Sequence, residues 1–196
     1  MKDTENIALF DMDGVLCDYD KSMKRNLEKI SDPNSTPPKI NRGENPLYIK
    51  NRIELIRNQQ GWWSNLEIYQ PGFDILEVAM NLGFKINILT KASRDALNSY
   101  TEKVLWLKNN MPNFEEISIT HAENKGSVYG KVLVEDYPKN IDKWLKWRKN
   151  GLVIMPDQSW NKNYENPQVV SYNGKNLEEI REKMKKARDR KARQSF

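Results

Sequence analysis

The chain has 196 residues, of which 38% are hydrophobic and 30% charged, and its formal net charge is +5. This length is enough to bury the core of one domain that carries an insertion. Its apolar runs fall short of the ~18 residues that a membrane span needs, and Met1–Asn6 lacks the apolar region of a signal peptide. A single cysteine, Cys17, excludes an intramolecular disulfide. We therefore expect a cytoplasmic protein with no membrane partner.

The first strong pattern is Ile7–Leu16, with the sequence IALFDMDGVL. Its apolar start predicts a buried strand within residues 5–10, and Asp11 and Asp13 follow where that strand ends. Gly14 permits a sharp turn after them. Ligands bind at the carboxyl edge of open α/β sheets, and paired carboxylates there suit Mg²⁺. An acidic loop that merely faces solvent is the alternative.

The remaining elements alternate along the chain. The helical spacing of apolar residues predicts helices over residues 20–30, 46–60, 73–82, 93–110, 139–149 and 176–193. Short apolar runs predict further strands over residues 84–89, 117–120, 131–134 and 152–155, and composition predicts a loop over residues 31–38.

This alternation predicts an α/β fold with a doubly wound parallel sheet. Residues 18–72 read as a helical insertion after the first strand. We therefore expect a catalytic core of residues 1–17 and 73–196, and a helical cap of residues 18–72.

The positive charge is concentrated at the C-terminus. Residues 181–193 contain eight basic and two acidic residues, which leaves 24 basic and 25 acidic residues in the rest. The basic helix and tail, residues 176–196, are typical of a solvated helix face. Binding of nucleic acid through this segment is the alternative.

Polar residues that suit phosphoryl transfer follow three of the predicted strands. Asp11 and Asp13 follow the first strand, Thr90 follows the second, and the acidic pair Glu135 and Asp136 follows the fourth. Because the transition state of phosphoryl transfer needs charge neutralisation and in-line positioning, this set favours a phosphatase.

A lysine would complete this set. Lys125 and Lys131 both lie near the fourth strand, and Lys125 is preferred because it lies in the loop that can reach the site. Asp11 is placed to attack phosphorus and form an aspartyl-phosphate. Asp13 would protonate the leaving oxygen and then activate water.

The stretch Asp11–Gly14, together with Thr90, Lys125, Glu135 and Asp136, resembles in order and context the four motifs of the haloacid dehalogenase-like phosphatases. Within them the chain is most similar to the 5'(3')-deoxyribonucleotidases. The supporting stretches are Asp11–Tyr19, Trp62–Gly72, Ile88–Ala92, Glu102 and Lys103 with Trp106, and Val134–Asn140.

The resemblance implies a Rossmann-like core with a small helical cap. It also implies that Mg²⁺ is bound by the Asp11 carboxylate, the Asp13 backbone carbonyl and the Asp136 carboxylate. Two residues depart from the family pattern. Glu135 stands where Asp is usual, which changes hydrogen bonding around the metal. Lys91 stands where a small residue is usual, and as a substrate-binding cation beside the expected phosphate it changes substrate choice.

The resemblance also assigns substrate-binding residues. Tyr19, Trp62 and Trp63 lie where the family has aromatic residues near the nucleobase, although tryptophans in a cap are more often part of its core.

We therefore predict a Mg²⁺-dependent phosphatase that hydrolyses nucleoside monophosphates, with deoxyribonucleotides preferred. One alternative is an enzyme acting on nucleic-acid termini, held by the basic tail. Another is a catalytically silent protein that uses the fold to bind a partner, against which the intact motif set argues.

Overall fold

The computed structural model of the chain describes residues 6–32, 34 and 45–190. Most of the predicted loop at residues 31–38, and the last residues of the predicted terminal helix, 191–193, lie outside the described residues.

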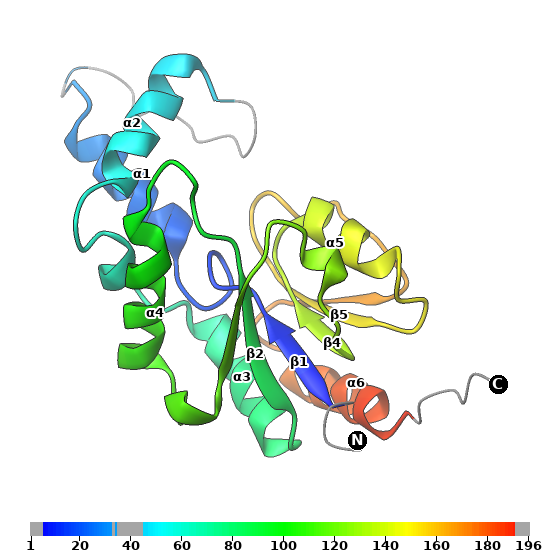
Figure 1. Ribbon diagram of the computed structural model, residues 1–196. Coiled ribbons are helices and arrows are strands. Elements are labelled where there is room, and N and C mark those ends of the chain that lie inside the picture. Colours follow the sequence, from blue (N-terminus) through cyan, green and yellow to red (C-terminus); the bar gives the residue numbers. More distant parts are fainter. Residues whose placement is uncertain (1–5, 33, 35–44, 191–196) are drawn as a thin grey trace. The chain divides into compact units, whose positions relative to one another are not determined.

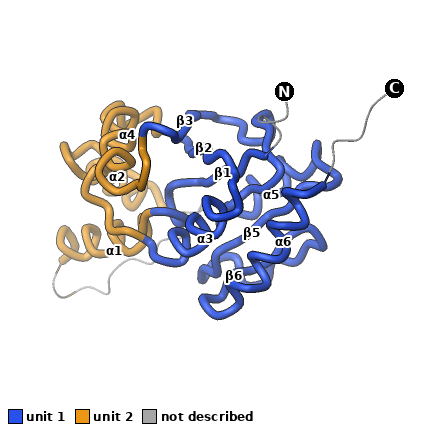
Figure 2. Tube along the Cα trace, turned by 90° about the horizontal axis from the view of Figure 1, so that it is seen from below, with its two compact units in different colours: residues 1–16, 69–91, 115–196 blue, residues 17–68, 92–114 orange. Residues whose placement is uncertain are grey.

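By its internal contacts the chain divides into two compact units (Figure 2). The first contains residues 1–16, 69–91 and 115–196, and the second contains residues 17–68 and 92–114. The second unit therefore combines most of the predicted cap with residues 92–114, which belong to the predicted core.

Six strands form one sheet in the first unit (Figure 1). In chain order they are β1 (Ile7–Phe10), β2 (Lys85–Thr90), β3 (Ser118–His121), β4 (Val132–Val134), β5 (Leu152–Pro156) and β6 (Val169–Tyr172). All pairings are parallel and the spatial order is β3-β2-β1-β4-β5-β6. This is the doubly wound order of Rossmann-like sheets, and it confirms the predicted fold class.

Helices cover both faces of this sheet, because its central strands are apolar on both sides. They are α3 (Gln70–Asn81), α5 (Pro138–Leu145) and α6 (Leu177–Asp189).

One face packs against α5. Leu9, Leu133 and Val153 are register partners on β1, β4 and β5, and they share a buried cluster with Ile141 and Trp144 of α5. Since side chains alternate along a strand, the intervening residues point to the opposite face. There α3 contacts β2, α6 contacts β5 and β6, and the two helices pack against each other (Figure 1).

The structure corrects three expectations about elements. Strand β6 was not predicted, because its sequence VVSY is short and follows a long polar segment. Helix α4 begins at Asn98 rather than at residue 93. Helix α6 is not wholly solvated, because Ile180 and Met184 are fully buried.

The second unit is helical. It contains α1 (Tyr19–Lys29), α2 (Leu47–Arg57), the single 3₁₀ turn η2 (Trp63–Asn65) and α4 (Asn98–Asn110). Among all the helices of the described residues, none is both long and apolar enough to cross a membrane.

Candidate active site

Asp11 lies at the first position after β1, at the centre of the sheet. Its backbone N–H donates to the carbonyl of Val134 on β4 over 2.9 Å. One carboxylate oxygen, Oδ1, accepts from the Met12 N–H over 2.7 Å and lies 2.6 Å from Lys125 Nζ. The carboxylate is thus held in one orientation by a backbone N–H and an ammonium group.

A tight turn follows Asp11 and carries Asp13, which is partly buried. The Met12 carbonyl accepts from the N–H groups of Val15 and Leu16, and Gly14 has a φ of 84°, in the left-handed region that favours glycine. Gly72 in the first turn of α3 packs against the same loop. A Cβ at residue 72 would lie only 1.7 Å from the Val15 carbonyl oxygen, so the helix approaches this turn as closely as a glycine allows.

Lys125 bridges two carboxylates. Its Nζ lies 2.8 Å from Glu135 Oε2, in addition to its contact with Asp11, and all three side chains are buried. The other Glu135 oxygen accepts from the Tyr137 N–H over 3.1 Å. Burial alone would lower the pKa of Lys125, but the adjacent Asp11 and Glu135 carboxylates outweigh it and hold that pKa above its ordinary value. Lys125 is therefore a fixed positive charge.

The alternative lysine lies elsewhere. Lys131 Nζ donates to the Asn6 side chain and to the carbonyls of Arg188 and Arg190. It precedes β4, at the amino edge of the sheet, whereas Lys125 contacts Asp11 at the carboxyl edge.

The carboxylates of Asp11, Glu135 and Asp136 converge at this edge. Each offers an oxygen, and these oxygens lie within 4.8 Å of one another. Because β1 and β4 pair with Phe10 opposite Val134, the residues that follow them are brought to the same level. Carboxylate oxygens are the ligands of hard cations such as Mg²⁺, so this acidic cluster could hold one.

Asn161 was not predicted as part of this region, although it supports Asp136. Its Nδ2 donates to the carbonyls of Asp136 and Pro156, each over 3.0 Å, while its Oδ1 accepts from the Gln158 N–H. Gln158 in turn donates to the Gly14 carbonyl over 3.0 Å. The loop after β5 thus links the turn that follows Asp11 with the segment that contains Asp136. This role could not be predicted, because a single Asn in a polar loop carries no motif.

Thr90 ends β2 and is fully buried, and its carbonyl accepts from the Ala122 N–H. The next residue, Lys91, is half-exposed and forms an ion pair of 2.6 Å with Glu123. Lys91 is the residue expected beside the substrate phosphate, and its positive charge is therefore accompanied by the negative charge of Glu123.

The predicted substrate-binding aromatics come together in the second unit. Tyr19, Trp62 and Trp63 are buried and in mutual contact, with ring centroids 4.8–5.8 Å apart. Arg57 Nε donates to the Tyr19 hydroxyl over 2.7 Å. The Glu102 carboxylate accepts from the N–H groups of Gly61 and Trp63 and so fixes the turn that carries both tryptophans.

Comparisons with solved structures agree with this fold. A HAD hydrolase, family IA, variant 3, from Entamoeba histolytica is similar with a TM-score of 0.55 and 13% identity, over 94% of this chain and 100% of that one. A haloacid dehalogenase-like hydrolase from Bacteroides fragilis has a TM-score of 0.50 and 13% identity, over 87% and 98%. At this identity the likeness shows the fold alone.

None of the curated proteins compared with the chain matches it. The model of one protein family does match, over residues 5–185, and its description is 5' nucleotidase, deoxy (pyrimidine), cytosolic type C protein. This match spans most of the chain and every motif residue at the strand ends. The chain therefore belongs to this nucleotidase family and is a phosphoric monoester hydrolase.

Proposed function

We propose that the protein is a Mg²⁺-dependent nucleotidase that hydrolyses deoxyribonucleoside monophosphates through an aspartyl-phosphate on Asp11. The observation that carries this proposal is the buried cluster in which Lys125 joins Asp11 to Glu135 beside Asp136. Membership of the nucleotidase family supports the substrate class.

The charge of the cluster supports a divalent cation. Three carboxylates and one ammonium group leave a net charge of about −2 when all are ionised, and such a concentration of buried charge is costly without a counter-ion. The Asp11 carboxylate, the Asp13 carbonyl and the Asp136 carboxylate would hold Mg²⁺. When bound, the ion would offset the repulsion between these carboxylates and the substrate phosphate.

In the proposed first step, an Asp11 carboxylate oxygen attacks phosphorus while the bond to the nucleoside oxygen breaks. Asp13 donates a proton to that leaving oxygen, so that the nucleoside departs as an alcohol. In the second step Asp13 takes a proton from water, whose oxygen attacks phosphorus and releases phosphate. Asp11 is thereby returned as a carboxylate.

Lys125 and Thr90 would assist by charge and hydrogen bonding. The ammonium group of Lys125 lies against the Asp11 carboxylate and would offset charge on the transferred phosphoryl group. The Thr90 hydroxyl would donate to one phosphoryl oxygen. Glu135 would act through Lys125, which it orients.

The proposal is tested by measuring phosphate release from pyrimidine and purine deoxynucleoside monophosphates and from oligonucleotides with a terminal phosphate. We expect turnover of mononucleotides that requires Mg²⁺ and is abolished by EDTA. Preference for the oligonucleotides would instead favour the enzyme acting on nucleic-acid termini.

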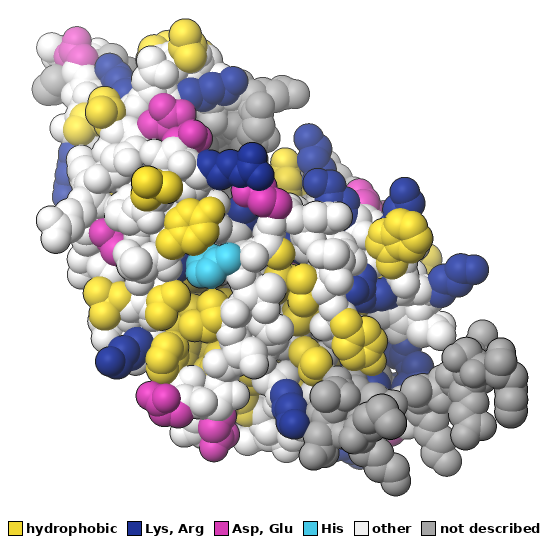
Figure 3. Space-filling view, viewed as in Figure 1, with side chains coloured by type: hydrophobic (Ala, Val, Ile, Leu, Met, Phe, Trp, Pro, Cys, Tyr) yellow, Lys and Arg dark blue, Asp and Glu magenta, His cyan; other side chains and the backbone are white. Residues whose placement is uncertain are grey.

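The face of the molecule drawn in Figure 3 shows no feature that favours this alternative. In the view of Figure 3, the described Lys and Arg side chains are spread over the face, with carboxylates between several of them. The C-terminal residues 191–196 lie outside the described residues.

A further inference from the structure

The loop after β5, residues 157–161, bonds both backbone segments that carry the proposed Mg²⁺ ligands. Gln158 Nε2 donates to the Gly14 carbonyl over 3.0 Å, in the turn after β1. Asn161 Nδ2 donates to the Asp136 carbonyl over 3.0 Å, in the segment after β4. Two segments that are far apart in sequence are therefore joined by two amide side chains of one short loop.

The turn after Asp11 gains from such a partner because it contains a glycine. Gly14 has a φ of 84°, and the backbone of glycine is freer to rotate than that of any other residue. The carbonyl that would bind the metal is that of Asp13, in the peptide unit that precedes the Gly14 Cα. Gln158 holds the peptide unit that follows this Cα, and it thereby restrains the unit that carries the Asp13 oxygen.

Asn161 has the corresponding role beyond the end of β4. Its side chain is only 1% exposed, and Nδ2 donates to the carbonyls of Asp136 and Pro156. Its Oδ1 accepts from the Gln158 N–H over 2.9 Å. Because both amide donors and the acceptor oxygen have partners, the side chain is held in one orientation. The Asp136 carbonyl is thus fixed to the end of β5 and to the residue that bonds Gly14.

The loop also has anchors of its own. The Asp157 N–H donates to the Tyr172 carbonyl of β6 over 3.0 Å. The Asp157 carbonyl accepts from the hydroxyl of Tyr69, the residue before α3, over 3.2 Å. The loop is therefore tied to the sheet and to a helix end, and its side chains act from a defined position.

We propose that Gln158 and Asn161 are positioning residues that preform the Mg²⁺ site by fixing the segments of Asp13 and Asp136. Mg²⁺ demands nearly ideal octahedral geometry, so ligands on a loose backbone would have to be ordered when the ion binds. Partners that hold metal ligands in place are known to affect metal affinity strongly. The inference rests on the proposed function, because it takes the Asp13 carbonyl and the Asp136 carboxylate as ligands.

Gln158→Met is the decisive variant. Methionine has a similar shape but no amide donor, and Gln158 is only partly buried, so the protein should fold. Binding of Mn²⁺ to the metal-free protein is followed by the EPR signal of the free ion, and Mg²⁺ is measured by displacement of Mn²⁺. We expect both dissociation constants to rise roughly two- to tenfold, the range for loss of one neutral hydrogen bond.

Asn161→Ala removes the bonds to both carbonyls and the acceptor for Gln158. In the folded protein it should raise the same dissociation constants roughly 10- to 100-fold, the usual range for a residue that orients metal ligands.

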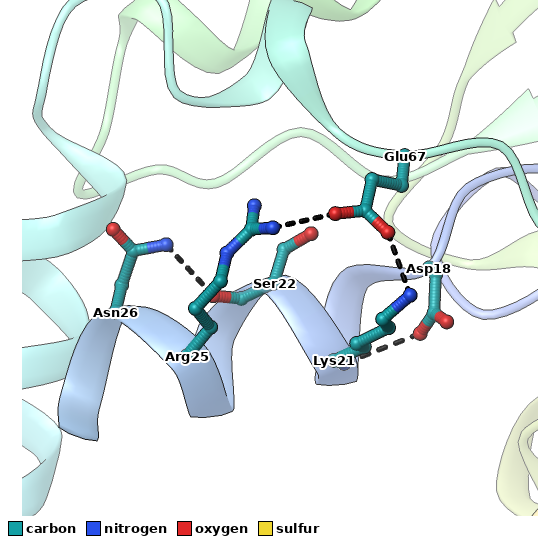
Figure 4. Close-up of polar contacts among 6 residues, drawn as sticks. All are labelled: Asp18, Lys21, Ser22, Arg25, Asn26 and Glu67. Carbon is teal, nitrogen blue, oxygen red and sulfur yellow. Dashed lines mark hydrogen bonds and ion pairs between the residues drawn. The ribbon is translucent and has the colours of Figure 1, made fainter. Parts of the chain in front are cut away.

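Asn26→Ala is the matched control. Asn26 Nδ2 donates to the Ser22 carbonyl over 2.7 Å, a partly buried bond between an amide and a carbonyl within α1 (Figure 4). The bond is of the same kind as that of Gln158, but it belongs to the second unit. Asn26→Ala should therefore leave both metal dissociation constants unchanged.

The kinetics should separate positioning from a merely structural role. At saturating Mg²⁺ the site of Gln158→Met is filled, so its kcat should be close to the wild-type value. The Mg²⁺ concentration that gives half the maximal rate should rise in parallel with the dissociation constant. A structural role alone would lower stability to urea without changing either metal constant.

The outcomes distinguish this inference from the proposed function. If the wild-type protein binds neither ion in a saturable way, the proposed metal-dependent function is contradicted, and this inference with it. If the wild-type protein binds both ions and Gln158→Met binds them equally well, the inference alone is overturned. Weaker binding by Gln158→Met together with unchanged binding by Asn26→Ala is the result that we expect.

Discussion

Lys125 is the residue whose charge holds the acidic cluster together. Replacing it by Met leaves Asp11 and Glu135 buried without their ammonium partner. Breaking a buried ion pair in this way costs about 3–5 kcal/mol, so Lys125→Met should lower the free energy of unfolding by that amount and abolish turnover. Urea denaturation and phosphate release measure the two effects.

Lys131→Met is the matched control. Lys131 bonds Asn6 and two carbonyls near the end of α6, so its loss should reduce stability by a smaller amount and leave kcat unchanged. Equal losses of kcat in both variants would contradict the assignment of Lys125 to the site.

The candidate site residues that belong to a sequence motif could be named from the sequence alone. Asp11 and Asp136 come shortly after strands whose apolar sequences are easily recognised, and Lys125 lies in the loop before β4. The parallel sheet brings these segments together. Asn161 could not be predicted, because its role rests on hydrogen bonds to backbone carbonyls that are distant in sequence. The pairing of Lys91 with Glu123 likewise depends on two neighbouring loops.

At the scale of elements, the close approach of α3 to the turn after Asp11 leaves no room for a side chain at residue 72. Gly72→Ala would place a Cβ 1.7 Å from the Val15 carbonyl oxygen, so the helix or the turn must move. We expect a loss of stability of at least about 2 kcal/mol and a fall in kcat of at least about a hundredfold, since small displacements of catalytic groups are costly.

Gly83→Ala is the comparison, because residue 83 lies just after the other end of α3 and has open space around its Cβ position. Its φ of 75° makes alanine strained there by about 1–2 kcal/mol. This variant should therefore lose stability but keep its kcat. A Gly72→Ala protein with normal kcat would show that the turn does not position Asp13.

Element boundaries were predicted less well where side chains bond the local backbone. Residues 93–97 have helical composition, yet Ser99 Oγ accepts from the Ser93 N–H and donates to the Ser93 carbonyl, an arrangement that competes with the helix. The buried face of α6 was missed because its charged residues dominate the sequence. Truncation at residue 181 would therefore expose core rather than test the basic tail alone.

At the scale of the molecule, the proposal assigns chemistry to the first unit and substrate choice to the second. Substitution of Tyr19, Trp62 or Trp63 by Ala should lower kcat/KM for nucleotides by roughly 5- to 150-fold, the range expected for loss of one base-stacking ring. Acetyl phosphate, which has no base to stack, should be hydrolysed about as well as before. Equal losses on both substrates would show that these buried rings serve only to hold the unit together.

The central claim is that Asp11 carries the phosphoryl group during turnover. The most direct measurement is rapid acid quenching of the enzyme with a deoxynucleoside monophosphate and Mg²⁺, followed by peptide mass spectrometry. We predict a phosphoryl group on the peptide that contains Asp11, and its loss, together with all turnover, in a folded Asp11→Asn protein. Turnover by Asp11→Asn, or a phosphoryl group found on another residue, would contradict the mechanism.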